Sequence, residues 1–408
     1  MSGPKKLVVI GGCGHVGLPL GIVFANAGIK VTLLDIDDRK IAMVNGGRLP
    51  FIEEGAEKAL RNVVGKALVA TSDKGCLRDA DAAVVVLGTP VDEHLNPTVS
   101  DLYRNIDFAV DLLPDDALLV LRSTVYPGVT KLVYDRVRSR NRRIHIAFCP
   151  ERILEGKAVE EISSMPQIIS AFEPAAFERA RELFALINKD LIELMPLEAE
   201  LAKLFTNSWR YLTFAISNQF YLLAESYGLD FYRIYDAVTL RYPRMKGFAR
   251  AGFAAGPCLL KDTLQLSAFS GNNFFLGHAA MLINEGLPNF VVSRLRKSDL
   301  ANKSVAILGM AFKGDSDDKR ESLSYKLRNL LTLEAKKVFC TDPYIQDDSF
   351  VTLEEAIDRA DIVIFGARHS VYRGLSIPQG KEIVDVWGFW AEAQSDRAVT
   401  TSAGREIL

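Results

Sequence analysis

Residues 7–17, LVVIGGCGHVG, decide the fold of the first part of the chain. An apolar strand runs into a G-x-G-x-x-G loop at Gly12, Gly14 and Gly17, and a helical pattern follows. In this context the first glycine permits a tight turn, the second lets the backbone approach a pyrophosphate, and the third lets the helix pack on the strand. Because the helix N-terminus then faces a phosphate, the segment predicts a dinucleotide-binding site.

Asp35, at the end of the next apolar strand, indicates which dinucleotide binds. A carboxylate there would bind the ribose hydroxyls and repel a 2′-phosphate, which favours NAD over NADP. Arg39 and Lys40 lie nearby and keep NADP as the alternative. We expect His15 and Val16 beside the cofactor.

Short apolar runs separated by helical patterns continue beyond this loop. Continuous apolar strands that alternate with helices predict a parallel sheet covered on both faces. The first domain is therefore expected to span residues 1–196. Its strands are expected at Leu7–Ile10, Val31–Leu34, Ala83–Leu87, Ala117–Leu121 and Ile144–Phe148.

A long helix is expected over Leu197–Tyr227, with Gly228 placed to end it. About 30 residues at about 1.5 Å each give ~45 Å, more than one small domain needs, so this helix should connect domains or join subunits. We expect a homodimer through it. Residues 197–297 form the predicted central helical domain.

A second strand and helix series begins at Ser304 and predicts a second α/β domain over residues 298–408. The predicted fold class is thus α/β, with two Rossmann-like doubly wound domains joined by a central helical domain with a long helix. The expected strands are Ser304–Leu308, Lys337–Cys340, Ile362–Phe365 and Ile383–Val386.

Composition narrows the class of protein. The 408 residues are 49% hydrophobic and 25% charged, and the net charge of −2 provides no global field that would attract nucleic acid. Five cysteines without C-x-x-C spacing argue against a disulfide framework or a metal site and favour a reducing cytoplasm. We expect no signal peptide and no membrane contact.

Cys258 is the strongest candidate for chemistry outside the glycine loop. It follows a glycine-rich turn and stands at an expected helix start, where the helix dipole and Lys261 would favour its thiolate. Asp262 lies one helical turn further on and can reach the same site. A buried structural cysteine is the alternative interpretation of this residue.

Lys203 and Asn207 stand four residues apart, so the long helix presents an ammonium and an amide on one face. Two such donors can stabilise an oxyanion that develops on a substrate. The alternative is a lysine that extends to solvent and an unremarkable surface amide.

Six segments together give the chain its resemblance to the UDP-glucose and GDP-mannose dehydrogenase family of nucleotide-sugar dehydrogenases. The resemblance covers nearly the whole length. The matching segments are the 12–17 loop with Asp35, STVYPG at 123–128, PER at 150–152, Lys203 with Asn207, the Cys258 segment, and AFK at 311–313 followed by DDKRES at 317–322.

The resemblance implies an N-terminal NAD domain, a central dimerising domain and a C-terminal domain that holds the nucleotide of the sugar donor. In the catalytic set it implies that Cys258 is the nucleophile, that Lys203 and Asn207 stabilise an oxyanion, and that Asp262 helps to activate water. Thr124 and Glu151 then order the hydrolytic water and serve acid/base steps. Further cofactor contacts are expected at Thr89, Pro90, Thr124 and Arg320, and further substrate contacts at Glu151, Arg152, Arg244, Phe253, Gly256, Phe312 and Lys313.

The implied reaction is a four-electron oxidation of a sugar C6 alcohol to the uronic acid. It passes through an aldehyde, a thiohemiacetal and a thioester on Cys258, and it consumes two NAD. Such products serve polysaccharide or glycoside biosynthesis. Pro150-Glu151-Arg152 resembles the form found in N-acetylhexosamine enzymes more than that of UDP-glucose enzymes.

The chain departs from the family pattern at Asn218-Gln219, where Asn-Glu is frequent, and at Ala254-Ala255, where two glycines are frequent. Two other functions stay open. A two-electron hydroxyacid dehydrogenase of related fold would need neither the thiol nor a second α/β domain. A non-catalytic nucleotide-sugar or NAD sensor would keep the glycine loop without needing Cys258, Lys203 and Asn207.

Overall fold

The computed structural model describes residues 4–88, 100–254 and 256–390. It divides into two compact units, Met1–Thr206 with Ala268–Gly271 and Asn207–Ser267 with Asn272–Leu408. Within the described ranges, every helix is too short or too polar to cross a membrane.

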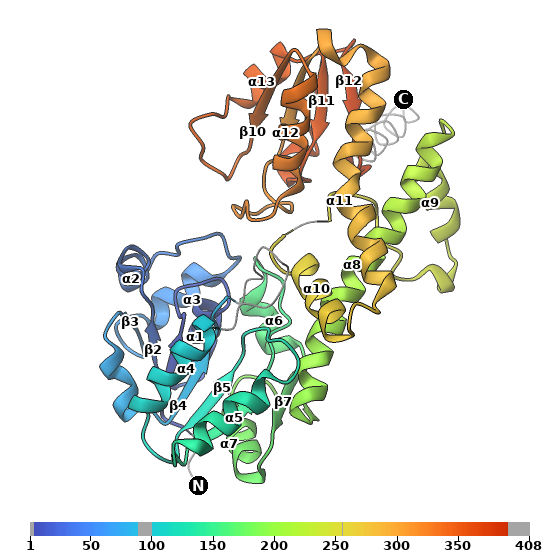
Figure 1. The fold of residues 1–408 in the computed structure, drawn as a ribbon. Helices are drawn as coiled ribbons and strands as arrows, with labels where there is room; N and C mark the ends of the chain where they lie inside the picture. Colours follow the sequence, from blue (N-terminus) through green and yellow to red (C-terminus); the bar gives the residue numbers. More distant parts are fainter. Residues whose placement is uncertain (1–3, 89–99, 255, 391–408) are drawn as a thin grey trace, which may run out of the picture. The chain divides into compact units, whose positions relative to one another are not determined.

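An eight-stranded sheet forms the centre of the first unit (Figure 1). The strand order is β3-β2-β1-β4-β5-β6-β7-β8, and neighbours are parallel except for the antiparallel pair β6–β7. The strands are β1 (Lys6–Ile10), β2 (Lys30–Leu34), β3 (Leu68–Thr71), β4 (Ala82–Val85), β5 (Leu118–Leu121), β6 (His145–Phe148), β7 (Gln167–Ala171) and β8 (Leu191–Leu194).

Two separate hydrophobic cores show that this sheet is covered on both faces. In β1, Leu7 and Val9 belong to one core, whereas Val8 belongs to the other. The same alternation recurs in β5, where Val120 and Leu121 lie in different cores. Side chains of a strand point alternately to its two faces, so a strand with apolar residues at every position must be covered twice.

Helices follow most strands of the first unit and supply these cores. Local sequence sets several of their starts: Asp37 caps α2 by accepting from the backbone N–H of Arg39 at 3.0 Å and of Lys40 at 3.2 Å, and α7 begins with a proline. The helices are α1 (Gly17–Asn26), α2 (Asp38–Asn45), α3 (Ala56–Val63), α4 (Ser100–Leu112), α5 (Val129–Ser139), α6 (Ala158–Ser164) and α7 (Pro174–Phe184).

The expected long helix is present as α8 (Pro196–Ser226), 31 residues in length. Gly228 follows it with φ +68°, and the N–H of Leu229 bonds to the carbonyl of Ala224 at 3.0 Å. This closure is the C-terminal motif that glycine favours, so the predicted stop is confirmed. The other helices of this region are α9 (Phe231–Thr239), α10 (Leu259–Phe269) and α11 (Phe275–Leu295).

A second parallel sheet lies in the second unit, with the strand order β10-β9-β11-β12. Its strands are β9 (Ser304–Leu308), β10 (Lys337–Thr341), β11 (Ile362–Phe365) and β12 (Glu382–Val384), accompanied by α12 (Leu323–Glu334) and α13 (Leu353–Arg359). The predicted α/β class, with two parallel sheets and a helical region, is therefore confirmed.

Candidate active site

The three glycines of the nucleotide loop have different reasons to be glycine. A Cβ at Gly12 would lie 2.7 Å from Cα of Leu33, and a Cβ at Gly17 would lie 2.5 Å from the carbonyl oxygen of Gly11. The fold itself therefore excludes side chains at both positions. At Gly14 the nearest atom would be 3.6 Å away, an ordinary contact, so packing within the chain does not demand glycine there. A ligand that approaches the backbone explains it, which fits a pyrophosphate.

Asp35 is fixed beside this loop. Its Oδ2 accepts from the backbone N–H of Cys13 at 2.8 Å, and its Oδ1 accepts from its own neighbour Ile36 at 2.8 Å. A partly buried carboxylate in this position fits the hydroxyls of an adenosine ribose. His15 stacks on Phe51 with ring centroids 4.1 Å apart, and Val16 is the cap of α1. The expected contacts Thr89 and Pro90 lie outside the described residues.

Thr124 lies in the 123–128 loop after β5, and a buried acid holds this loop. Glu200, on the first turns of α8, accepts from Gly128 N–H at 2.6 Å, from Thr130 N–H at 2.8 Å and from the Thr130 hydroxyl at 2.6 Å. Burial raises the pKa of Glu200, while these donors lower it. The same helix therefore carries Lys203 and anchors the loop that carries Thr124.

Glu151 follows β6 and is 7% exposed. Its Oε1 accepts from the N–H groups of Arg152 at 2.7 Å and of Ile153 at 3.1 Å, while Nε of Arg122 donates to Oε2 at 2.9 Å. Arg122 is 2% exposed, and a second guanidinium nitrogen also contacts this Oε2. Both oxygens accept hydrogen bonds, so the side chain of Glu151 is held in one orientation and can act as an acceptor for a polar hydrogen.

Arg122 also bonds to the carbonyl of Cys149 at 3.0 Å and to Oε1 of Gln167 at 2.9 Å. It thus links β5, β6 and β7 beneath Glu151. Arg152 is half-buried, and burial lowers the pKa of its guanidinium; the charge of Glu151 opposes this shift and that of Arg122 adds to it. Its Nη2 donates to the carbonyl of Pro166.

In the second unit, Cys258 directly precedes the first residue of α10, and its carbonyl accepts the N–H of Asp262 at 2.9 Å. Asp262 is completely buried. Its Oδ2 accepts from Nδ2 of Asn207 at 2.5 Å, and its Oδ1 forms an ion pair with Lys261 Nζ at 2.7 Å. The structure therefore joins Asn207 and Asp262 directly, one turn from Cys258. Lys203 is 9% exposed and stands on the same helix as Asn207.

Cys258 differs from the other four cysteines, since it is exposed while the others are buried or half-buried. Burial, together with nearby Asp35, raises the pKa of the Cys13 thiol to about 12, and burial raises that of Cys149 to about 12. Burial raises the pKa of Cys76 and of Cys340 to about 11. These four thiols are poor nucleophiles at neutral pH.

The turn before Cys258 is fixed by a buried amide. Asn218 accepts from Gly252 N–H at 2.8 Å and donates to the carbonyl of Gly252 at 3.0 Å. Phe253 is 2% exposed and packs on Trp387 with ring centroids 6.3 Å apart. Its side chain thus supports the turn from the core side. The departure noted at 218–219 leaves this clamp intact.

Gly256 connects the turn to the loop after β9. Its φ of +101° favours glycine, and a Cβ would lie 2.6 Å from the ring of Phe312. Lys313 holds its ammonium 5.6 Å from the centre of that ring. These three expected substrate contacts therefore lie together.

The remaining two predicted contact residues are Arg320 and Arg244. Arg320 pairs with Asp318, its Nε lying 2.9 Å from Oδ2. Arg244 is exposed, in a short 3-10 helix, with its guanidinium 5.6 Å from the Tyr242 ring.

Sequence reasoning missed three positioning residues: Arg122, Glu200 and Asn218. Each is a polar side chain that is at most 2% exposed. Arg122 directly follows a fully apolar strand, and Glu200 lies three residues before Lys203, so both positions carried a signal. Their partners come from distant segments, which the sequence pattern does not reveal.

Comparison with family models adds three matches. Residues 5–188 match the NAD binding domain of the UDP-glucose/GDP-mannose dehydrogenase family, 197–285 match its central domain, and 306–392 match its UDP binding domain.

Individual nucleotide-sugar dehydrogenases are similar to this chain over nearly its whole length. The UDP-N-acetyl-D-mannosamine dehydrogenase of Pyrococcus horikoshii is 28% identical over 384 residues, which covers 90% of this chain and 91% of the relative. The NDP-N-acetyl-D-galactosaminuronic acid dehydrogenase of Ralstonia nicotianae is 25% identical over 95% of this chain and 96% of its own. The structure of a UDP-glucose dehydrogenase from Pyrobaculum islandicum matches with a TM-score of 0.88 at 27% identity, with 96% of each chain covered.

Proposed function

The chain belongs to the UDP-glucose/GDP-mannose dehydrogenase family, and on that premise we propose that it oxidises the C6 hydroxymethyl group of a UDP-sugar to a carboxylate with NAD. The named relatives are nucleotide-sugar dehydrogenases, and the NAD binding and UDP binding domains are both represented. Two features support NAD as the cofactor: the open space beside Gly14, and the Asp35 carboxylate held by the backbone N–H of Cys13.

The observation that carries the four-electron reaction is the position of Cys258. It is exposed at the start of α10, with the Asn207–Asp262 contact one turn away. A helix N-terminus and a neighbouring lysine both favour a thiolate. Neither a hydroxyacid dehydrogenase nor a sensor would need this arrangement.

The proposed overall reaction converts the alcohol, one water and two NAD⁺ into the carboxylate, two NADH and three protons. NAD, when bound, accepts a hydride in each of the two oxidations. Between them the Cys258 sulfur attacks the aldehyde carbon and forms a thiohemiacetal, whose oxidation gives a thioester. Water then breaks the C–S bond and releases the acid and the thiolate, so that the enzyme returns to its starting state.

Asn207 and Lys203 are proposed to stabilise the oxyanion on C6. An amide nitrogen has two N–H donors, and the bond to Asp262 uses one of them. Because Asp262 fixes the amide, the other donor has a defined direction before substrate arrives, which is the condition for electrostatic preorganisation. Lys203 adds a positive charge from a largely buried position. Asp262 is also proposed to accept a proton from the hydrolytic water.

Glu151 and Thr124 are proposed to orient that water. The hydrogen bonds from Arg122 hold the Glu151 carboxyl group in place, which suits an acceptor of a water hydrogen. Of the roles that the resemblance implies for Glu151, we therefore propose the ordering of water and not the donation of a proton. Arg152, Arg244, Phe253, Gly256, Phe312 and Lys313 stay proposed substrate contacts, and His15, Val16, Thr89, Pro90 and Arg320 proposed cofactor contacts.

For the sugar we propose an N-acetylhexosamine, with glucose as the second candidate. UDP-N-acetyl-D-mannosamine and an N-acetylgalactosamine derivative appear in the names of the relatives described above, whereas the Pyrobaculum islandicum structure is of a UDP-glucose enzyme. The Pro150-Glu151-Arg152 segment also favours an N-acetylhexosamine, because it resembles the form found in enzymes that act on such sugars.

We further propose a cytoplasmic homodimer with domains at 1–196, 197–297 and 298–408. Five free cysteines suit a reducing compartment. Exposed apolar side chains recur on α8 and just after it at helical spacing, which suits a self-complementary interface. They are Phe205, Trp209, Ile216, Phe220, Leu223 and Tyr227.

The test is a measurement of NADH formed per sugar, with UDP-N-acetylmannosamine, UDP-N-acetylglucosamine and UDP-glucose. We expect two NADH and one uronate per sugar from the unaltered protein. Cys258→Ala should lose uronate formation by several orders of magnitude yet still bind NAD and UDP-sugar, because the lost side chain is small. Cys258→Ser should stall as an ester, which hydrolyses more slowly than a thioester.

Cys76→Ala is the matched control, since it removes a half-buried thiol from the first unit. Full uronate production by Cys258→Ala would show that this cysteine is a packing residue. A yield of one NADH per sugar from the unaltered protein would instead favour the two-electron dehydrogenase, and binding without any NADH would favour the sensor.

A further inference from the structure

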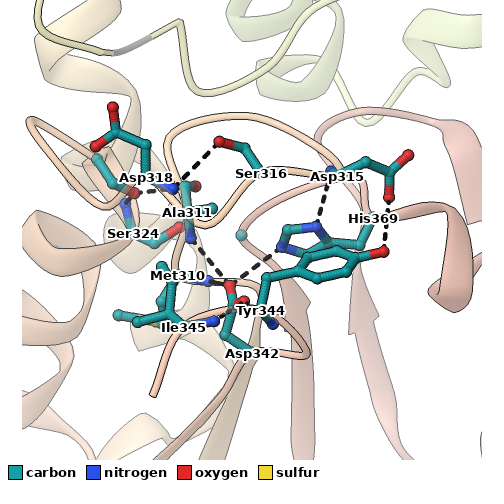
Figure 2. A network of polar contacts seen from close by, with 12 residues as sticks. Met310, Ala311, Asp315, Ser316, Asp318, Ser324, Asp342, Tyr344, Ile345 and His369 are labelled. Atoms are coloured by element: carbon teal, nitrogen blue, oxygen red, sulfur yellow. Dashed lines mark hydrogen bonds and ion pairs between the residues drawn. The ribbon is translucent and has the colours of Figure 1, made fainter. Parts of the chain in front are cut away.

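The loop that carries Phe312 and Lys313 is held by a buried carboxylate from the neighbouring strand. Asp342, which follows β10, accepts with Oδ2 from Met310 N–H at 2.6 Å and from Ala311 N–H at 3.0 Å. Its Oδ1 accepts from Tyr344 N–H at 2.8 Å. Burial alone would raise the pKa of Asp342, but the hydrogen bond from His369, with the backbone donors, brings it below its usual value. Figure 2 shows this carboxylate below the loop.

His369, which follows β11, extends the network to the far end of the same loop. It is completely buried. Its Nε2 lies 3.1 Å from Oδ2 of Asp342, and its Nδ1 lies 2.9 Å from the backbone nitrogen of Asp315. Figure 2 shows the imidazole between these two partners. The ring joins Asp342 to the segment that follows Lys313.

The two partners fix the tautomer of this histidine. A backbone N–H can only donate, so Nδ1 of His369 must carry a lone pair toward Asp315. The ring proton is then on Nε2 and points at the Asp342 carboxylate. The neutral imidazole with its proton on Nε2 satisfies both bonds. An imidazolium would place two donors opposite each other at Asp315.

The far end of the loop depends on such bonds. Asp315 has φ +53°, a left-handed conformation that is costly for a residue other than glycine. Its Oδ1 accepts from Ser370 N–H at 2.8 Å and from the Ser370 hydroxyl at 3.0 Å. Phe312 and Lys313 therefore lie on a loop fixed at one end by Asp342 and at the other by His369 and Ser370.

We propose that neutral His369 is a positioning residue for nucleotide binding: by accepting from Asp315 and donating to Asp342, it holds Phe312 and Lys313 in the conformation that receives the UDP moiety. This inference rests on the proposed function, since it takes these two residues as nucleotide contacts. His369 itself touches neither substrate nor reacting atoms.

The inference makes UDP affinity depend on both hydrogen bonds of His369. The groups that face this ring are the carboxylate of Asp342, the backbone nitrogen of Asp315 and the rings of Tyr344 and Tyr372, whose centroids lie 5.1 and 5.5 Å away. Loss of the lone pair at Nδ1 removes the bond to Asp315, and loss of the donor at Nε2 removes the bond to Asp342. Nucleotide binding should therefore weaken when either bond is lost.

Three variants separate the two bonds. His369→Asn places Oδ1 where Nδ1 was and keeps an acceptor for Asp315. His369→Gln keeps a donor near Asp342 but loses that acceptor. His369→Phe keeps a ring and loses both. The probes are UDP and NAD, measured by calorimetry with the full-length protein, and His278→Phe is the control because its Nε2 bonds to Ser267 at 2.8 Å, outside this network.

We expect His369→Phe to bind UDP about tenfold more weakly, the scale of one lost hydrogen bond to a buried group. NAD affinity should not change. His369→Asn should retain UDP affinity better than His369→Gln.

Equal UDP affinity of His369→Phe and the unaltered protein, with circular dichroism showing both folded, would overturn the inference. So would equal UDP affinity of His369→Asn and His369→Gln, because only the Asn variant keeps the acceptor for Asp315. If His369→Phe does not fold, the Asn and Gln pair still decides the matter. Absence of UDP binding by the unaltered protein would refute the proposed function itself and is thus a different result.

Discussion

Replacing Arg122 by methionine tests the buried charge network under Glu151. The guanidinium is 2% exposed and its carboxylate partner 7%, so removal of Arg122 leaves a buried anion without its counter-charge. The carbonyl of Cys149 and the side chain of Gln167 lose donors at 3.0 and 2.9 Å as well. Breaking a buried pair from one side typically costs about 3–5 kcal/mol. The two N–H groups that still hold Glu151 place our expectation at the lower end.

The double variant Arg122→Met/Glu151→Leu should cost less than the sum of the two single variants, because the second change removes the stranded charge. The coupling between neighbours of this kind is about 0.5–3 kcal/mol. Arg136→Met is the control, since Arg136 pairs with Asp107 at the surface and should matter little.

The assay must report on the first unit. Tryptophans stand at 209, 387 and 390, so intrinsic tryptophan fluorescence would follow other parts of the chain. Hydrogen exchange of peptides from β6 and β7 measures the opening free energy where Arg122 acts. A cost for Arg122→Met no larger than that of Arg136→Met would refute the buried network as a source of stability.

Three further outcomes are expected. Asp35→Asn should narrow the preference for NAD over NADP, measured as kcat/KM with each cofactor, and an unaltered protein that prefers NADP tenfold would contradict the role of Asp35. At pH 8 iodoacetamide should label Cys258 first, since the other four thiols have pKa values raised to about 11 or 12 and gain thiolate only as the pH rises toward those values; mass spectrometry that finds another cysteine labelled first would contradict this. Phe220→Glu should shift a dimer toward monomer in light scattering, and a protein that is monomeric before the change would disprove the α8 interface.

Elements with strong local signals could be predicted from sequence. The 12–17 loop announces its turn through glycines at fixed spacing, and α8 through a long helical pattern that ends at Gly228. Strand β9 was expected at its observed bounds because its apolar run is continuous. In each case the determining interactions lie within a few residues of one another.

Elements that depend on distant partners were missed. β8 (Leu191–Leu194) is partly exposed and includes an acidic residue, so its sequence reads weakly as a strand, and pairing with β7 is what makes it one. The same holds for the site: no feature of the sequence near Arg122 predicts its contact with Glu151, 29 residues away. The sequence analysis did not single out His369, because its partners Asp315 and Asp342 follow two other strands.

The hydrogen bonds of Glu200 to Gly128 and Thr130 fix how α8 is rotated about its axis at this residue. From there, every residue turns the helix by about 100°, because 3.6 residues complete a turn. Lys203 lies three residues after Glu200 on α8, so the direction of its side chain around the helix axis is set by the number of residues between them. Insertion of one residue between Glu200 and Lys203 would rotate the Lys203 side chain about the helix axis by about 100°, although the residue itself would be unchanged. Insertion before Glu200 could be absorbed at the helix start, so the chain should tolerate length changes on one side of this acid and not on the other.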